Sequence, residues 1–212
     1  MPHPQRSVPR ILESGKTIFA LLLLAACNAA VAQGWEIRYS TGVSLTAAVE
    51  GQEFSFDFPR SPGSVHYVTK PVTLAAGVAA SATFTITTAG DPVFDYRTAA
   101  NNTCDSPAAV RLLLQRRGDD MSGAGRYEFY RWWSNAGAVL KEGTFTVSVP
   151  LQPSLWTSVF GKKGDANPRA YAEAVADLGN VGVTFGGGCF YGHGVRILNG
   201  RATFTMNRFA VQ

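Results

Sequence analysis

The stretch SATFTITT, residues 81 to 88, alternates apolar and hydroxyl side chains. As an extended chain it places Phe84 and Ile86 on one face and threonines on the other. This pattern is typical of an antiparallel strand with one buried face and one face in water. The same alternation recurs in GTFTVSV (143–149) and GRATFTMNRF (200–209). The inward-facing side chains expected from these two strands are Phe145, Val147, Val149, Ala202, Phe204 and Met206.

Four further strands are expected between turn signals. Their ranges are 110–117, 126–134, 181–185 and 194–198. Combinations of Gly, Pro, Asn and Asp separate the strands, and each of them favours a turn. Many short strands at this spacing predict an all-β sandwich or barrel of antiparallel sheets.

A single short helix is expected near residues 168–178. Asn167 can cap its amino end, Pro168 suits its first turn, and Gly179 suits a left-handed stop. The side chains predicted to form its buried stripe are Tyr171, Val175 and Leu178.

Residues 1–32 have the features of a signal peptide. The apolar run TIFALLLLAA (17–26) follows a basic lead and is too short to span a bilayer. Cleavage after AVA (30–32) would leave residues 33–212 as a single domain. The alternative is cleavage at the lipobox LAAC (24–27). The chain would then be cut before Cys27, and Cys27 would become the lipidated first residue. Either route predicts export, to the periplasm, the outer membrane as a lipoprotein, or the medium.

The charge of the exported part argues against nucleic-acid binding. Residues 1–32 hold 3 of the 19 Lys and Arg and 1 of the 15 Asp and Glu, so their removal lowers the net charge from +4 to +2. The remaining basic residues are scattered and mostly matched by acids. Contact with a membrane is therefore expected only through a lipid anchor on Cys27.

Two cysteines remain after the signal peptide. Cys104 and Cys189 form an even pair in an oxidising compartment, which predicts a disulfide between them.

The order of elements in the last part of the chain resembles a known fold family. VPLQPSLWTSVFGKKG (149–164) is followed by the helix segment PRAYAEAVADLGN, the strand VGVTF and the closing strand ATFTMNRFAV. This order resembles galactose-binding-like jelly-roll sandwiches, in particular laminin-domain-IV-like domains of bacterial exported proteins, and carbohydrate-binding modules share the fold. The resemblance covers residues 140–212 and implies a jelly-roll sandwich that acts by binding.

A structural calcium ion occurs in related modules, but its motif is altered in this chain. An acidic residue near the last strand helps to hold that ion, whereas this chain reads MNRF, with Asn207 and Arg208. Calcium requires six to eight oxygen ligands. No cofactor is therefore expected.

The glycine-rich stretch VGVTFGGGCFYGHGV (181–195) raises the question of an active site. Its glycines argue against a helix that would align Cys189 with His193, and no helix follows to bind a phosphate. A metal would need more partners than His66. We therefore expect no catalytic residue and no metal site, and only Tyr191 and His193 remain candidates for ligand contact.

Aromatic residues in YEFYRWW (127–133) provide the main functional indication. Alternation places Tyr130 and Trp132 on one face and Trp133 on the other, and adjacent tryptophans cannot both enter one core. We expect Tyr130 and Trp132 to lie outside the main core, either on a sugar-stacking surface or beneath the helix or a loop. Arg111 and Arg117, or Arg116 after a bulge, could add polar contacts from the neighbouring strand.

These observations favour an exported, non-catalytic binding domain, with a glycan or another cell-envelope component as the ligand. One alternative is a structural or protein-interaction domain at the cell surface without a sugar site. A glycoside- or polysaccharide-active enzyme is a third possibility, because the spacing of carboxylates in the fold cannot be read from the sequence.

Overall fold

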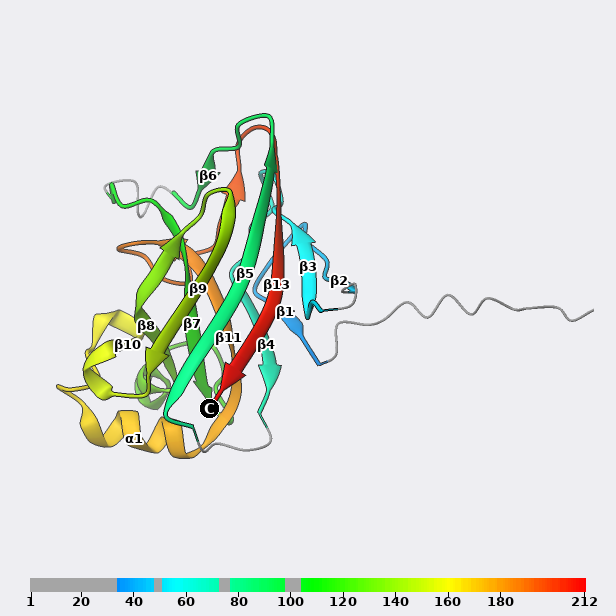
Figure 1. Ribbon diagram of the computed structural model, residues 1–212. Helices are drawn as coiled ribbons and strands as arrows, with labels where there is room; N and C mark the ends of the chain where they lie inside the picture. The colour runs from blue at the N-terminus through cyan, green and yellow to red at the C-terminus, as the bar shows by residue number, and fades with distance from the viewer. Residues whose placement is uncertain (1–33, 48–50, 73–76, 98–103) are drawn as a thin grey trace, which may run out of the picture.

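The computed structural model describes residues 34–47, 51–72, 77–97 and 104–212. Two antiparallel sheets pack face to face, and one helix covers an end of the sandwich (Figure 1). The prediction of an all-β fold with one short helix is confirmed. The predicted signal peptide and the candidate lipidation residue Cys27 lie outside the described residues.

The first sheet has the strand order β1-β4-β11-β7-β8-β10. Its strands are β1 (Glu36–Arg38), β4 (Tyr67–Pro71), β11 (Leu178–Gly187), β7 (Ala108–Arg116), β8 (Arg131–Val139) and β10 (Trp156–Ser158).

The second sheet has the order β2-β3-β13-β5-β9, and two short strands form a separate pair. The strands of the second sheet are β2 (Thr46–Ala47), β3 (Phe54–Asp57), β13 (Arg201–Val211), β5 (Ala79–Ala89) and β9 (Gly143–Pro150). The separate pair is β6 (Phe94–Asp95) with β12 (Arg196–Ile197).

The connections between the sheets follow the jelly-roll topology. In chain order, the principal strands are β3, β4, β5, β7, β8, β9, β11 and β13. Numbered in that order, they lie as 1-8-3-6 in one sheet and 2-7-4-5 in the other. This is the arrangement of two Greek keys that defines a jelly roll.

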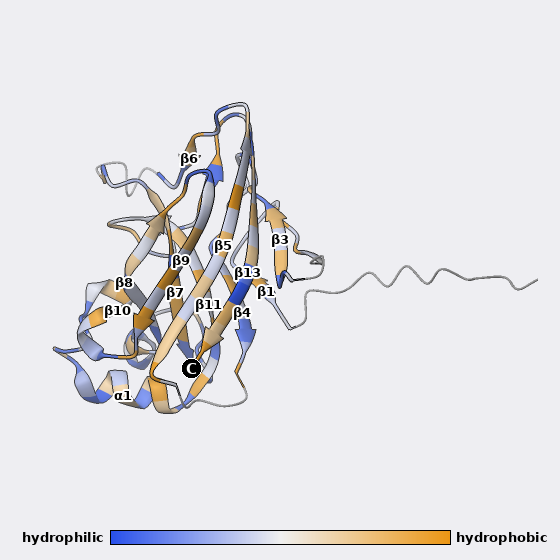
Figure 2. Cartoon of the chain, viewed as in Figure 1, coloured by the Kyte–Doolittle hydropathy of each residue, from blue (hydrophilic) through white to orange (hydrophobic). Residues whose placement is uncertain are grey.

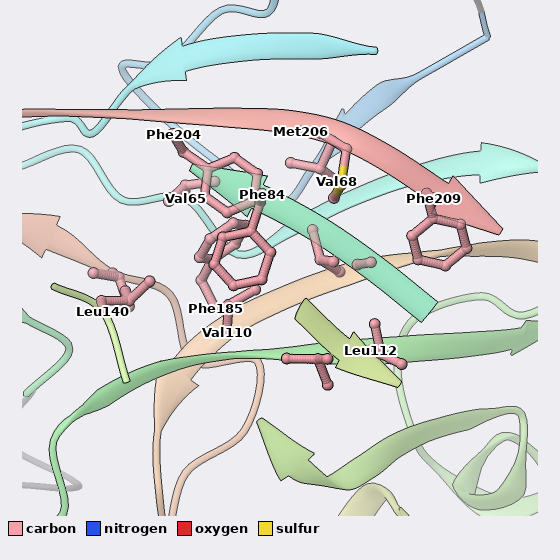
Figure 3. Packing of buried hydrophobic residues seen from close by; sticks show 14 of the residues in the cluster. Val65, Val68, Phe84, Val110, Leu112, Leu140, Phe185, Phe204, Met206 and Phe209 are labelled. Carbon is pink, nitrogen blue, oxygen red and sulfur yellow. The ribbon is translucent and has the colours of Figure 1, made fainter. Parts of the chain in front are cut away.

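The core lies between the two sheets and is rich in phenylalanine. Figure 3 shows Phe84 and Phe204 projecting from neighbouring strands toward Phe185 of the opposite sheet. The ring centroids of Phe84 and Phe204 are 5.0 Å apart, and those of Phe185 and Phe204 are 5.2 Å apart in an edge-on contact. The alternation predicted for β5, β9 and β13 is confirmed, because the apolar side chains of these strands face inward. Figure 2 colours these strands with hydrophobic segments between more polar ones.

The outer face of the five-stranded sheet is covered with hydroxyl groups. The hydroxyls of Thr83 and Thr146 are 3.0 Å apart, and those of Thr85 and Thr144 are 2.9 Å apart. These cross-strand pairs stabilise the β5–β9 contact on a face exposed to water.

Helix α1 (Pro168–Ala176) ends earlier than the sequence predicts. Leu178 and Gly179 already belong to β11, which pairs with β7, so the predicted left-handed stop at Gly179 is wrong. A Cβ atom on Gly179 would lie 2.8 Å from the Cα atom of Arg117, so glycine allows the two chains to approach closely here. The Asn167 amide donates to the Lys163 carbonyl rather than capping the helix.

The predicted strand 126–134 starts later than expected and runs on to Val139. Residues Gly125–Phe129 form a 3₁₀ helix, and β8 begins only at Arg131. Gly123 and Gly125 have positive φ angles of 72° and 56°, and this backbone turns the chain before the strand can start.

Candidate functional site

The outer face of the six-stranded sheet carries both apolar and polar side chains, and most of them are buried. Its centre is a small apolar cluster of Tyr67, Leu113 and Trp133, against which Met121 and Tyr191 pack. Around this cluster lie buried polar side chains, which are Thr69, Gln115, Arg131 and Thr184. Loops therefore cover this face, in contrast to the open threonine face of the other sheet.

One of these loops is fastened by a buried ion pair. Arg131 and Asp119 approach to 3.1 Å, and their side chains are only 6% and 1% exposed. A second Arg131 nitrogen donates to the Met121 carbonyl at 2.8 Å. Burial also raises the pKa of the neighbouring Tyr67 hydroxyl, and the charge of Arg131 partly opposes this shift.

Trp132 does not lie where the sequence analysis places it. Its side chain is fully buried in the main core, at 0% exposure. The ring packs edge-on against Tyr171 of α1 at 5.1 Å, and its Nε1 donates to the Phe129 carbonyl. Trp132 therefore belongs to the main core rather than lying outside it, and its contact with Tyr171 agrees with the expected alternative of a place beneath the helix. Its ring is closed to a ligand.

The register of β8 against β7 explains this result. Trp132 pairs with Leu114 on the inner face, and Trp133 pairs with Leu113 on the outer face. Arg131 shares the outer face with Trp133, and a charged residue is more easily accommodated outside the main core than inside it. That charge was the signal in the sequence that could have identified the outward-facing tryptophan.

Tyr130 and Arg117 lie beside α1. Tyr130 is half-buried, with the Arg116 guanidinium 4.9 Å from its ring centroid. Arg117 is exposed and forms an ion pair with Asp177. Neither residue lines the cleft described next, so the structure does not bring them together with Tyr191 and His193.

A cleft of about 710 Å³ opens beside Trp133. One wall is the glycine-rich loop 188–193, and the other is the turn after β10. Its aromatic lining consists of Trp133, Phe160, Phe190 and Tyr191. Its polar and charged side chains are Thr157, Ser158, Lys163 and His193. The prediction had named Tyr191 and His193, while Phe160, Phe190, Trp133 and Lys163 were missed.

The loop wall is held in place by close backbone approaches and by a disulfide. A Cβ atom on Gly187 would lie 2.2 Å from the ring of Tyr96, and one on Gly192 would lie 2.3 Å from the Tyr67 hydroxyl. Only glycine fits at these two positions. Cys189 is joined to Cys104, with Cα atoms 6.2 Å apart, so the predicted disulfide is confirmed.

Tyr191 is fixed in the cleft by its neighbours. The Arg111 guanidinium lies 4.0 Å from its ring centroid, and the ring of Trp133 meets it edge-on at 6.1 Å. Arg111 also donates to the carbonyls of Ser134 and Asn135, and burial lowers its pKa. Arg111, a candidate for polar contact with a ligand, therefore lies behind Tyr191 and does not line the cleft.

His193 is exposed at the rim, with its ring 5.1 Å from that of Phe190. Partial burial lowers the pKa of His193. The neighbouring His66 is tied more firmly: its Nδ1 lies 3.0 Å from the Gly192 carbonyl, and its Nε2 lies 2.8 Å from the Ser64 hydroxyl.

Phe160 stands on the opposite side of the cleft. It lies in the short 3₁₀ turn Val159–Gly161, and its backbone is left-handed, with φ 65° and ψ 21°. Its side chain is 72% exposed. A large aromatic residue in this conformation is unusual, and such strain is often found at functional sites.

Within residues 34–47, 51–72, 77–97 and 104–212, no three His, Cys, Asp or Glu side chains are grouped closely enough to hold a metal ion. Among the helices of this same part of the chain, none has the length and apolarity needed to cross a membrane.

A comparison of the chain with known protein families, curated proteins and solved structures finds no significant match.

Proposed function

We propose that the protein is an exported, non-catalytic binding domain that holds a glycan in the cleft beside Trp133. The observation that carries this proposal is the grouping of four aromatic side chains, of which Phe160 is exposed, with polar side chains in one concave site. Sugars offer apolar C–H faces to aromatic rings and hydroxyls to polar side chains. The volume of about 710 Å³ is in the usual range for sites that enclose small molecules.

Phe160 is the leading candidate for the stacking platform. Among the four aromatic residues that line the cleft, Phe160 has the most exposed side chain. Tyr191 forms the facing wall and is held rigidly by Arg111 and Trp133. A ring that is already fixed loses little conformational freedom when a ligand binds, which favours affinity.

A glycan array followed by calorimetry on the strongest ligand tests the proposal. We expect Phe160→Ala and Tyr191→Ala each to weaken binding by about tenfold or more. Tyr130→Ala is the matched control, because Tyr130 is a partly buried aromatic outside the cleft. Equal loss in the control, or no glycan bound at all, would contradict the proposal.

A protein partner at the cell surface is the second candidate, and Phe160 favours it as well. An exposed aromatic ring beside a cleft can anchor a protein chain. Cross-linking on intact cells with wild type and Phe160→Ala would identify such a partner. Binding of a purified protein without any glycan ligand would support this second function.

Export itself is tested at the amino terminus of the mature protein. Mass spectrometry is expected to find either a diacylglyceryl group on Cys27 or a free amino terminus at Gln33. Retention of residues 1–26 in the purified protein would contradict export.

A further inference from the structure

The basic side chains that line the cleft are Lys163 and His193, and at neutral pH Lys163 carries the charge, because burial lowers the pKa of His193. No carboxylate is among the described residues that line the cleft. The Asp119 side chain is 1% exposed and is already paired with Arg131. A bound ligand therefore meets the charge of Lys163 without a competing anionic group in the lining.

Arg111 adds a second, independent indication. Its side chain packs under Tyr191, and its Nε is buried without a hydrogen-bond partner among the described residues. None of the ion pairs in the described part of the chain involves Arg111, whose guanidinium is held only by carbonyl groups and the Tyr191 ring. Arg111 is half-buried as a whole, and charges that leave water even in part are normally paired, because desolvation of a charged group costs free energy.

The position of Arg111 directs its charge toward the cleft. Tyr191 lines the cleft and Arg111 does not, so the guanidinium acts from behind the ring. In a low-dielectric wall its field is screened less than the field of a solvated side chain. The field of Arg111 therefore adds to that of Lys163 and makes the cleft electropositive.

We infer that the ligand of this cleft is an acidic saccharide, whose carboxylate or sulfate group lies between Lys163 and Tyr191 while a sugar ring stacks on Phe160. This inference rests on the proposed glycan-binding function and specifies its substrate class. The charge of Arg111 attracts this anion from behind the Tyr191 ring, without direct contact.

The test is calorimetry with three oligosaccharides of equal length at about 0.15 M ionic strength, where long-range attraction is largely screened. The probes are a neutral glucan, an oligogalacturonate that carries carboxylates, and a sulfated galactan. We expect at least one acidic probe to bind about tenfold or more tightly than the neutral one. The comparison of carboxylate with sulfate identifies the acidic group.

Lys163→Ala is expected to weaken binding of the acidic probe by about five- to tenfold and to leave binding of the neutral probe unchanged. Lys141→Ala is the matched control, because it removes the same charge from an exposed turn outside the cleft. An equal loss in both variants would mean that the attraction is non-specific, and it would overturn the inference.

Arg111 provides a second readout. Arg111→Lys keeps the charge and is expected to retain the preference for the acidic probe, whereas Arg111→Met is expected to reduce that preference to near equality. Both variants are first checked for a wild-type unfolding transition. If the neutral glucan binds as tightly as the acidic probes, the inference fails while the proposed function stands. If no saccharide binds, the proposed function itself fails.

Discussion

At the residue scale, the two adjacent tryptophans of β8 have separate roles. Trp132 fills the core between β8 and α1, and Trp133 supports the wall of the cleft. Phe160 is a third case, because its ring is exposed and its backbone is left-handed. The core ring should matter for stability and the exposed ring for binding, and single substitutions can separate the two properties.

Phe160→Gly is expected to weaken ligand binding by about tenfold or more without lowering stability. A left-handed conformation costs an ordinary residue about 1–2 kcal/mol, and glycine adopts it freely, although glycine also gains entropy in the unfolded chain. Urea denaturation should give a free energy of unfolding equal to that of wild type or higher by up to about 1 kcal/mol. A clear loss of stability would show that the Phe160 ring packs as a structural residue.

Trp132→Ala is expected to lower the free energy of unfolding by about 3–5 kcal/mol, because a large cavity would open between β8 and α1. The loss is measured by urea denaturation. Tyr130→Ala, at a half-buried position, should cost clearly less. Equal losses from the two substitutions would contradict the assignment of Trp132 to the core.

The stability of the protein should decrease in mild acid because of His66. Burial lowers the pKa of His66 below its ordinary value of 6.5, and the hydrogen bond with Gly192 only partly opposes this shift. The folded state thus binds fewer protons than the unfolded state, so this stabilisation is present above about pH 6.5 and is lost as the pH falls through the folded-state pKa. His193 adds to the same trend, since burial also lowers its pKa.

Denaturation curves between about pH 8 and about pH 5 measure this effect. His66→Gln is expected to flatten the dependence on pH, and His193→Gln to flatten it less. A wild-type stability that rises below pH 6.5 would contradict the prediction.

At the element scale, the loop between β7 and β8 depends on the Asp119–Arg131 ion pair. Asp119→Asn would leave the Arg131 charge buried without its partner. We expect a loss of about 3–5 kcal/mol in the free energy of unfolding. The double variant Asp119→Leu with Arg131→Met removes both charges and should recover much of that loss. Failure of the double variant to improve on the single one would indicate that the pair acts through its hydrogen bonds.

The elements that the sequence predicts best are those with one face in water. Phe84 and Thr85 in β5 differ in polarity because one meets the core and the other meets solvent. The strands β7 and β8 are harder to predict from the sequence, because loops also bury the outer face of their sheet. Leu113 and Trp133 are therefore apolar although they lie on that outer face, and the alternation of apolar and polar residues is lost. The helix end was misplaced because Leu178 is buried equally well in a strand.

The candidate site was only partly predictable for a related reason. Tyr191 and His193 lie in a glycine-rich stretch that stands out in the sequence, and both line the cleft. Phe160 and Lys163 come from a turn whose position depends on the pairing of Thr157 with Trp133. That pairing joins distant parts of the chain, and local patterns do not encode it.

At the scale of the whole molecule, the Cys104–Cys189 disulfide joins residues that are 85 positions apart and also anchors the loop wall of the cleft. Closing a loop of this length is worth about 4 kcal/mol in the chain-entropy model. We expect reduction to lower the free energy of unfolding by about this amount and to weaken binding in the cleft.

Denaturation and calorimetry with and without a phosphine reductant measure both effects. The Cys104→Ser, Cys189→Ser double variant should behave like the reduced protein and should not respond to the reductant. Unchanged binding after complete reduction would show that close packing of the glycines is enough to hold the loop.

The central position of β13 also determines when the sandwich can form during translation. β13 lies between β3 and β5, so both of these strands are synthesised before the strand that pairs with them. Neither strand can complete its hydrogen bonds until residues 201–211 have been synthesised. The order of synthesis therefore delays completion of the five-stranded sheet until residues 201–211 are available.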